Sequence, residues 1–420
     1  MTATTEPGPL TDAELAESGS PLTAAFQDYV ATVRAGDVGS LPAVLGFIVL
    51  VAYFGFGTDQ FFSLLNGANL LQQGVGIIFV AMGLVFVLLL GEIDLSAGFA
   101  AGTSAAAMAV LLTQHNVAWP LAVVGCLLTG AVIGLVIGLL VARLNIPSFV
   151  VTLSFFLGLQ GAMLAIIGEG GTISIHDSTI LAIMNNNLPV LWGWVLFLGA
   201  ILIYAGLGLN HRRVRNNAGL PAEPIILFVV KTGALALLLG VATYLLNLER
   251  SVNPALNSLK GVPILVPFAA VFVVVLTFVL HRTEFGRHIY AVGGNAEAAR
   301  RAGISVPGIR IACFVICSVM ASIAGILFAS RDNSVSPTTG GSTTLLLAVG
   351  AAVIGGTSLF GGKGRIIDAV VGGLVIAVIN NGLPLVTSKA AAQYVVTALV
   401  LLLAASVDAI ARRRAAASGR

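Results

Sequence analysis

Residues 95–142 read LSAGFAAGTSAAAMAVLLTQHNVAWPLAVVGCLLTGAVIGLVIGLLVA, and none of these 48 residues is Asp, Glu, Lys or Arg. A helix that crosses a bilayer needs about 20 mostly apolar residues, so the stretch is too long for one span. The segment from His115 to Pro120 supplies a turn between two spans. Because strands of a membrane barrel alternate polar and apolar residues, the unbroken apolar runs favour helices. The stretch therefore predicts two successive transmembrane helices.

The composition extends this prediction to the whole chain. Of the 420 residues, 57% are apolar and 9% are charged, and the mean hydropathy is +1.01. A soluble domain carries about 25% charged residues. The composition excludes a soluble enzyme, a DNA-binding protein and a disordered scaffold, and a net charge of +3 indicates no nucleic-acid partner. The three cysteines lie in apolar runs, which predicts packing roles rather than a disulfide or a metal site.

Twelve apolar segments predict an all-α, polytopic membrane bundle. They cover 41–57, 71–91, 97–114, 118–142, 147–167, 189–209, 224–247, 262–281, 309–330, 344–360, 366–384 and 390–410. Before them, Ser20, Pro21 and Gly36 predict the start and end of a short helix that lies on the membrane surface. This N-terminal segment lacks the basic start and the cleavage site of a signal peptide, so we expect it to remain in the mature protein.

Basic residues orient the spans, because Lys and Arg concentrate in cytoplasmic segments. With the N-terminus inside, sixteen of them are cytoplasmic: Arg34, Arg143, Arg212, Arg213, Arg215, Arg282, Arg287, Arg300, Arg301, Arg310, Lys363, Arg365, Arg412, Arg413, Arg414 and Arg420. Four are in outer loops: Arg250, Lys260, Arg331 and Lys389. Both termini are therefore predicted to be cytoplasmic.

Polar side chains within the predicted spans are mainly amides and hydroxyls. A carrier driven by protons or sodium usually needs intramembrane acids or histidines, whereas here the only acid pair near a span is Glu92 and Asp94, at its inner end. Five amides are candidates for the path of a neutral, polyhydroxylated solute: Asn69, Gln72, Gln73, Asn380 and Asn381. For each of them a structural hydrogen bond between helices is an equal alternative.

Catalytic and nucleotide-binding signatures are missing from the sequence. The run 356–364, GTSLFGGKG, places its Lys one position too late for a nucleotide-binding loop, and no Ser or Thr follows it. We therefore expect no enzyme activity, no bound cofactor and no metal in this chain. Any ATP that powers transport must be hydrolysed by another polypeptide.

The loop 281–308, HRTEFGRHIYAVGGNAEAARRAGISVPG, is longer than a cytoplasmic hairpin requires. Asn295 can cap a helix, Glu297 suits the positive N-terminal end of that helix, and Gly303 can end it. The residues between them are good helix formers. The loop predicts a basic helix of about two turns, suited to a cleft on a partner protein. A merely solvated loop is the alternative.

Several segments resemble one family of membrane proteins. Glu297-Ala298-Ala299-x-x-x-Gly303 resembles the E-A-A-x-x-x-G motif of permease subunits in bacterial ABC importers. GEIDLSAG at 91–98 resembles the G-G-I-D-L-S-V-G of ribose- and xylose-type monosaccharide permeases, and departs from it at Glu92 and Ala97. Further similar segments follow in the same order and spacing: IPSFVVTL at 146–153, FGRHIYAVGGN at 285–295, AVIGGTSLFGGKGR at 352–365 and NNGL at 380–383.

The resemblance implies a permease of the bacterial cytoplasmic membrane that works in a complex. Its partners would be a second copy of the chain, a cytoplasmic ATP-binding cassette subunit that holds ATP and Mg, and a sugar-binding protein outside. The coupling helix that contacts the ATPase would comprise Asn295, Glu297, Ala298, Ala299, Arg300 and Gly303. The inner-mouth motif would comprise Gly91, Glu92, Asp94 and Ser96, whose acids we expect to cap and anchor a helix break. The outer loops 168–188 and 331–343 would dock the binding protein.

The chain departs from the ribose-type permeases by two extra spans around the basic loop at 211–215. Longer, xylose-type permeases look like this, which favours a pentose. We expect five regions: a tail with a surface helix (1–40), a first transmembrane half (41–167), an inserted helix pair (189–247), a second half with the coupling loop (262–410) and a basic tail (411–420).

Other functions stay open as alternatives. Within the same class, the solute would be ribose, another sugar, a furanone signal or a nucleoside. A proton-coupled sugar carrier also commonly has twelve spans, but the predicted core lacks a titratable relay. A membrane-embedded enzyme is less favoured, because the sequence offers no nucleophile, base or metal constellation.

Overall fold

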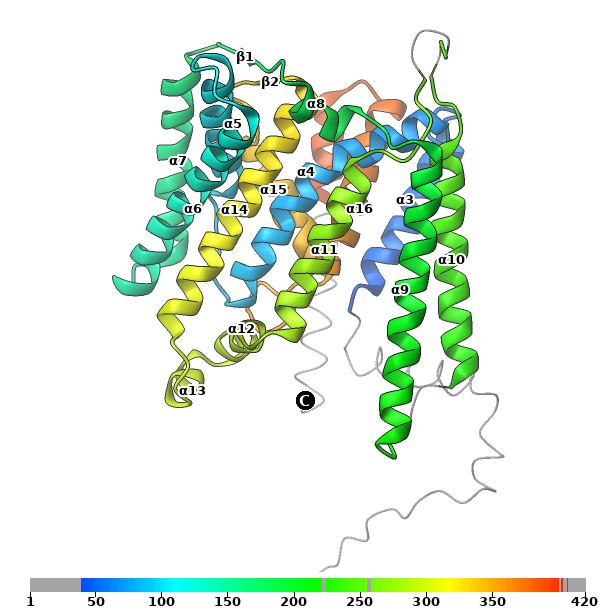
Figure 1. Ribbon diagram of the computed structural model, residues 1–420. Helices are drawn as coiled ribbons and strands as arrows, with labels where there is room; N and C mark the ends of the chain where they lie inside the picture. Colours follow the sequence, from blue (N-terminus) through cyan, green and yellow to red (C-terminus); the bar gives the residue numbers. More distant parts are fainter. Residues whose placement is uncertain are drawn as a thin grey trace, which may run out of the picture. The chain divides into compact units, whose positions relative to one another are not determined.

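The computed structural model describes residues 39–220, 224–251, 253–254, 258–399, 402 and 406, and these are almost entirely helical (Figure 1). Eight described helices are long and apolar enough to cross a membrane, and four shorter apolar helices accompany them. Together they provide a helix at each of the twelve predicted places, which confirms an all-α, polytopic membrane bundle. The predicted surface helix, the end of the last span and the basic tail lie outside the described residues.

The helices and strands follow one another along the chain in a simple order. They are α3 (Leu41–Gly57), α4 (Leu64–Leu89), α5 (Ala97–Thr113), α6 (Trp119–Arg143), α7 (Ser148–Ile167), β1 (Ile173–Ser174), α8 (Ser178–Asn185), α9 (Val190–Asn217), α10 (Ile225–Asn247), α11 (Leu265–Arg282), α12 (Glu284–Gly294), α13 (Ala296–Arg301), α14 (Val306–Asp332), β2 (Ser334–Val335), α15 (Gly341–Gly355) and α16 (Ile366–Val386). A further apolar helix covers Ala390–Leu399.

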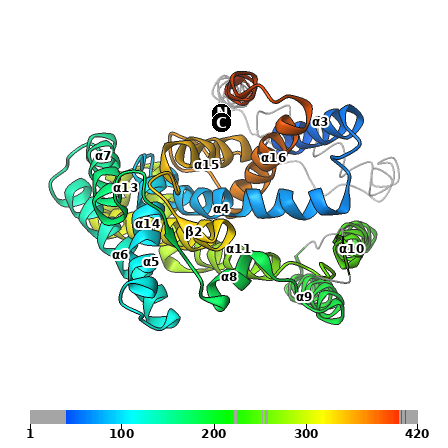
Figure 2. The same ribbon diagram turned by 90° about the horizontal axis from the view of Figure 1, so that it is seen from above.

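The described residues fall into two compact units. One unit contains Leu191–Leu245, which is most of α9 and α10, and the other contains Gly39–Val190 and the described part of Leu246–Ala409. In the larger unit α4 is buried from Gly74 to Leu89. It packs against α14 on one side and against α15 and α16 on the other (Figure 2).

Small residues let these helices approach closely. A Cβ atom on Gly83 of α4 would lie 2.9 Å from the carbonyl oxygen of Cys317 on α14. A Cβ atom on Gly134 of α6 would lie 2.5 Å from the carbonyl oxygen of Phe314 on the same helix α14. Because lipid gives no hydrophobic drive for helices to associate, such close backbone packing is a main source of stability in a membrane bundle.

Three helix boundaries differ from the prediction by five residues or more. α4 begins at Leu64 rather than 71, because the Ser63 side chain accepts a hydrogen bond from the Asn66 backbone N–H and caps the helix there. α15 ends at Gly355 rather than 360, because Gly356 takes a φ of +117°. The predicted basic loop at 211–215 is wrong. These residues belong to α9, which continues to Asn217, and its three Arg residues are good helix formers.

The larger unit places its irregular segments at its two ends. α12 and α13 lie at one end, and β1, β2 and α8 lie at the other (Figure 1). β1 pairs with β2 antiparallel, with Ile173 opposite Val335 and Ser174 opposite Ser334. The two outer loops that we expect to dock a binding protein are therefore joined to each other.

Candidate functional site

α13 occupies the centre of the predicted coupling loop. The Asn295 side chain accepts a hydrogen bond of 2.9 Å from the Ala298 backbone N–H, and so caps the helix as predicted. Gly303, with a φ of +86°, lies just beyond its end. Ala299 is buried, whereas Ala298 and Arg300 are exposed. The helix thus presents to its surroundings one face of polar and small side chains.

The charges on α13 are paired along the helix. The Glu297 carboxylate lies within ion-pair distance of Arg300, and its Oε1 lies 3.2 Å from Nε of Arg301. Exposed pairs of this kind contribute only about 0.3–0.5 kcal/mol each. We infer that Glu297 holds the direction of the two guanidinium groups more than it stabilises the fold.

α12 supports α13, and no helix was predicted for its residues from the sequence. The Thr283 side chain caps α12 by accepting a hydrogen bond of 3.2 Å from the Gly286 N–H. Gly293 lies against the end of α4, since a Cβ atom there would be 1.9 Å from the Leu89 carbonyl oxygen. The Gly362 N–H donates a hydrogen bond of 2.8 Å to the same carbonyl. The coupling loop therefore rests on α4 and on the loop 356–365.

The inner-mouth motif lies beside this support. Gly91 has a φ of +73°, and a Cβ atom on it would be 3.3 Å from the Phe360 carbonyl oxygen. Glu92 forms an ion pair with Arg310 near the start of α14, with 3.3 Å between Oε1 and Nε. Residues far apart in the sequence thus converge where α4 ends.

Asp94 of the same motif is fully buried. Its Oδ1 accepts hydrogen bonds of 2.8 Å from the Ser96 backbone N–H and of 2.6 Å from the Ser96 hydroxyl. Burial raises the pKa of the Asp94 carboxyl, and the hydrogen bonds from Ser96 oppose that shift. The geometry gives Asp94 and Ser96 a role in forming the turn before α5.

A polar cavity of about 350 Å³ lies near the opposite end of the larger unit. α4 contributes Gln73 and Ile77 to its lining, and α16 contributes Asn380. The remaining lining residues come from α14, α15 and the segment between them: Phe328, Arg331, Asp332, Ser336, Thr338, Thr339, Gly340 and Thr344. The cavity brings together amides, hydroxyls, one ion pair and one aromatic ring.

The charged and aromatic groups of this cavity are fixed by contacts with one another. Nε of Arg331 donates a hydrogen bond of 2.8 Å to Oδ1 of Asp332, and the Arg331 guanidinium lies 5.6 Å from the centre of the Phe328 ring. The Ser336 backbone N–H donates to the Thr339 hydroxyl at 3.0 Å. Amides and hydroxyls both donate and accept hydrogen bonds, so the lining suits a neutral solute with many hydroxyl groups.

Of the five predicted path amides, the structure brings Gln73 and Asn380 together at the cavity. Asn381 instead exchanges two side-chain hydrogen bonds with Asn66, at 2.7 and 2.9 Å. Gln72 donates to the Met184 carbonyl at 2.8 Å, and Asn69 does not line the cavity. For Asn381 and Gln72 the geometry therefore favours the structural alternative.

Sequence reasoning missed the hydroxyl groups of the cavity. Residues 336–344 read SPTTGGSTT and precede an apolar span directly. This polar run was the available signal. Among the described residues, no group of three or more His, Cys, Asp or Glu side chains could hold a metal ion.

Comparison with known proteins shows the family to which the chain belongs. Residues 66–405 match the family model described as the branched-chain amino acid transport system / permease component. The chain belongs to this permease family. The xylose transport system permease protein XylH of Escherichia coli K12 is 33% identical over 343 residues, which are 81% of this chain and 84% of that protein. XylH of Haemophilus influenzae is 31% identical over 343 residues, which are 81% of this chain and 88% of that protein.

The ribose import permease protein RbsC of Escherichia coli K12 is 31% identical over 344 residues, which are 82% of this chain and 85% of that protein. No solved structure matches the chain. The matched region includes both the cavity and the coupling loop of this permease. Transport across a membrane is thus the activity of the family to which the chain belongs.

Proposed function

We propose that this permease is the membrane-spanning subunit of an ATP-driven importer and that its solute is a monosaccharide, preferably a pentose such as xylose. The similarity to xylose and ribose permeases supports a sugar. The observation that carries the proposal is the cavity of amides and hydroxyls with Phe328 at its edge. Ribose and other small polyhydroxylated solutes are the alternative cargoes within this class.

The cavity would act as a weak station for the sugar on its way through the protein. Gln73 and Asn380 face it from two different helices, so that a sugar between them can exchange hydrogen bonds with both. Phe328, which is buried beneath the Arg331 guanidinium, contributes an apolar part of the wall. A transport site must bind weakly enough to release its solute, which suits an open lining of neutral groups.

The complex would contain two copies of the chain, an ATPase in the cytoplasm and a sugar-binding protein outside. The exposed face of α13 is the surface that we propose for the ATPase. The joined outer loops at β1 and β2 are the surface that we propose for the binding protein. ATP and Mg would be held by the partner ATPase, and the permease itself would bind no cofactor.

Uptake of labelled xylose and ribose tests the proposal in proteoliposomes that contain the permease, its ATPase and its binding protein. Replacing Asn380 by Leu removes one hydrogen-bonding group from the cavity, and each lost bond is worth about 0.5–1.5 kcal/mol. We expect xylose uptake to fall about threefold to tenfold, and further in the double variant with Gln73→Leu.

Gln160→Leu is the matched control, because Gln160 is an exposed amide of α7 that does not line the cavity. Its uptake should equal that of the wild type. Equal uptake by the cavity variants and the control would contradict the proposed site. Faster uptake of ribose than of xylose by the wild type would favour the ribose alternative.

A further inference from the structure

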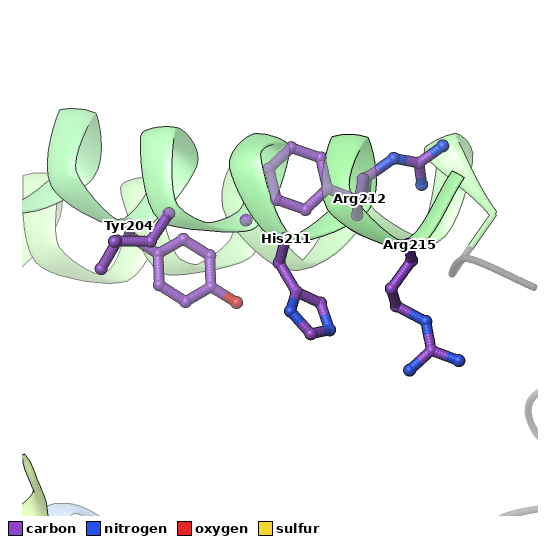
Figure 3. Close-up of a pocket in the computed structure, with 7 residues that line it drawn as sticks. Tyr204, His211, Arg212 and Arg215 are labelled. Atoms are coloured by element: carbon purple, nitrogen blue, oxygen red, sulfur yellow. The ribbon is translucent and has the colours of Figure 1, made fainter. Parts of the chain in front are cut away.

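The smaller unit contains a pocket of about 520 Å³ between α9 and α10, to which the proposed function assigns no role (Figure 3). Its apolar part is formed by Tyr204, Leu207 and Phe228. Its basic part is formed by His211, Arg212 and Arg215, one to three turns further along α9. We call this the α9–α10 pocket. It combines an apolar wall with a cationic rim.

Packing between the two helices creates this hollow. A Cβ atom on Gly208 would lie 2.3 Å from Cε2 of Phe228, so the ring rests directly on the backbone of α9. Tyr204 and His211 lie along the same helix, with Arg215 one turn further (Figure 3). A close contact between the two helices therefore forms one part of the pocket.

The length of α9 indicates the depth of the basic rim. Trp192 and Trp194 stand near its start, and such residues prefer the membrane–water interface. A hydrocarbon core of about 30 Å corresponds to about 20 helical residues at about 1.5 Å per residue. Counted from Trp192, this distance ends at Arg212. The rim thus lies at headgroup level, in the leaflet that the distribution of basic residues predicts to be cytoplasmic.

We propose that the α9–α10 pocket binds one anionic phospholipid of the cytoplasmic leaflet. The phosphate of the headgroup would accept hydrogen bonds from His211 and Arg215, which point to the same side of α9, and Arg212, which points to the other side, would add positive charge to the rim (Figure 3). The upper part of one acyl chain would cover Leu207 and the rings of Tyr204 and Phe228. A small soluble anion would satisfy the rim but leave the apolar wall uncovered, so the pocket fits a lipid better.

Lipid binding to the full-length, delipidated permease in detergent tests this site. The probes are dioleoylphosphatidylglycerol and dioleoylphosphatidylcholine, and bound lipids are counted by native mass spectrometry. We expect the wild type to retain one phosphatidylglycerol at concentrations where phosphatidylcholine is absent. The double variant Arg212→Gln/Arg215→Gln should bind phosphatidylglycerol about tenfold more weakly or less.

Arg213→Gln is the control, because Arg213 lies on the same turn of α9 and does not line the pocket. It should change the affinity less than about twofold. An equal loss in Arg213→Gln and in the double variant would overturn the proposal, because it would indicate a general charge effect. Equal binding of the two lipids by the wild type would overturn it as well.

Leu207→Asn separates a lipid from a free anion, because it changes the apolar wall and leaves every charge in place. We expect it to weaken phosphatidylglycerol binding about threefold or more. No effect of this variant, or displacement of the lipid by millimolar inorganic phosphate, would contradict a lipid site. Residues 2–38 contain six acidic residues. If phosphatidylglycerol bound only after their removal, the occupant of the pocket would be this segment and not a lipid.

Discussion

The Tyr290 hydroxyl donates a hydrogen bond of 2.6 Å to the backbone carbonyl of Gly364, and so joins α12 to the loop that precedes α16. At the same support, Gly293 lies against the last residue of α4. α4 carries Gln73 at the cavity, about 24 Å from Leu89 along the helix, and α16 carries Asn380. The coupling loop is therefore attached to two of the helices that line the cavity.

This connection predicts the effect of Tyr290→Phe. The variant removes one hydrogen bond, worth about 0.5–1.5 kcal/mol, from the contact between α12 and the loop 356–365. Burial raises the pKa of Tyr290, so its hydroxyl stays a donor at physiological pH. We expect the number of sugars imported per ATP hydrolysed to fall several-fold while the ATPase still co-purifies with the permease.

Tyr394→Phe serves as the control for this prediction, because Tyr394 is exposed on the last described helix. It should leave uptake and ATP hydrolysis unchanged. An unchanged ratio of import to hydrolysis in Tyr290→Phe would show that the hydrogen bond does not transmit movement.

Two adjacent glycines of α12 allow a matched pair of variants. A side chain at Gly293 would meet the Leu89 carbonyl oxygen at 1.9 Å, whereas one at Gly294 would have no atom within 4 Å. Gly293→Val should destabilise the protein by about 1–3 kcal/mol, because the displaced backbone also carries the Gly362 hydrogen bond. Gly294→Val should have little effect. Thermal unfolding of both variants checks this, and equal melting temperatures would refute the close contact.

The buried Asp94 predicts a pH dependence of stability. The pKa of the Asp94 carboxyl is raised in the folded state. Its contribution to the free energy of unfolding is therefore fully present below the ordinary pKa of 3.8 and is lost as the pH rises through the raised pKa. Asp94→Asn keeps an acceptor for the Ser96 N–H and removes the titration. As the pH rises above 3.8, the melting temperature of Asp94→Asn should therefore fall less than that of the wild type.

Asp94→Ala provides the comparison, because it removes the acceptor as well as the charge. We expect it to lose about 1–3 kcal/mol of stability throughout the pH range, since two donors of Ser96 lose their partner. If Asp94→Asn lost as much stability as Asp94→Ala, the hydrogen bonds from Ser96 would not account for the stability that Asp94 contributes. The charge of Asp94 would then be required for it.

Glu249 organises the outer segment after α10. Its carboxylate accepts hydrogen bonds from the backbone N–H groups of Ser251 and Leu259 and from the Ser258 hydroxyl, which lower its pKa to about 2. The order that it confers should be present above a pH of about 4.5 and be lost as the pH falls towards 2.

Hydrogen exchange of the Leu259 amide checks this prediction at neutral pH. In Glu249→Gln the Leu259 amide should exchange several-fold faster than in the wild type. Glu169→Gln, which changes another exposed outer acid, should not alter it. Unchanged exchange in Glu249→Gln would mean that the carboxylate does not hold the segment.

The sequence predicted what depends on local patterns. The apolar runs located the twelve helices, and Asn295 and Gly303 marked the start and end of α13, because caps act within one turn. The extent of α9 was wrong, since charged residues mark the edge of a membrane without ending a helix. α12 was missed because its buried face is short and interrupted by glycines.

The sequence alone could not predict contacts between segments that are far apart in the chain. Asn380 and Asn381 are chemically identical neighbours, yet they face different directions on α16, because successive residues of a helix are turned by about 100°. One lines the cavity and the other pairs with Asn66. Nothing in the local sequence distinguishes them. The same holds for Tyr290 and Gly364, which are separated by 74 residues.

We propose that sugar import depends on a separate ATPase that acts through α13, and ATP-driven xylose uptake by Gly303→Pro and Glu297→Lys is the most direct test. Proline cannot adopt the φ of +86° at Gly303, and Lys at position 297 would repel Arg300 and Arg301. Both variants should insert normally and lose at least about 90% of uptake. Full uptake together with normal co-purification of the ATPase in both variants would contradict it.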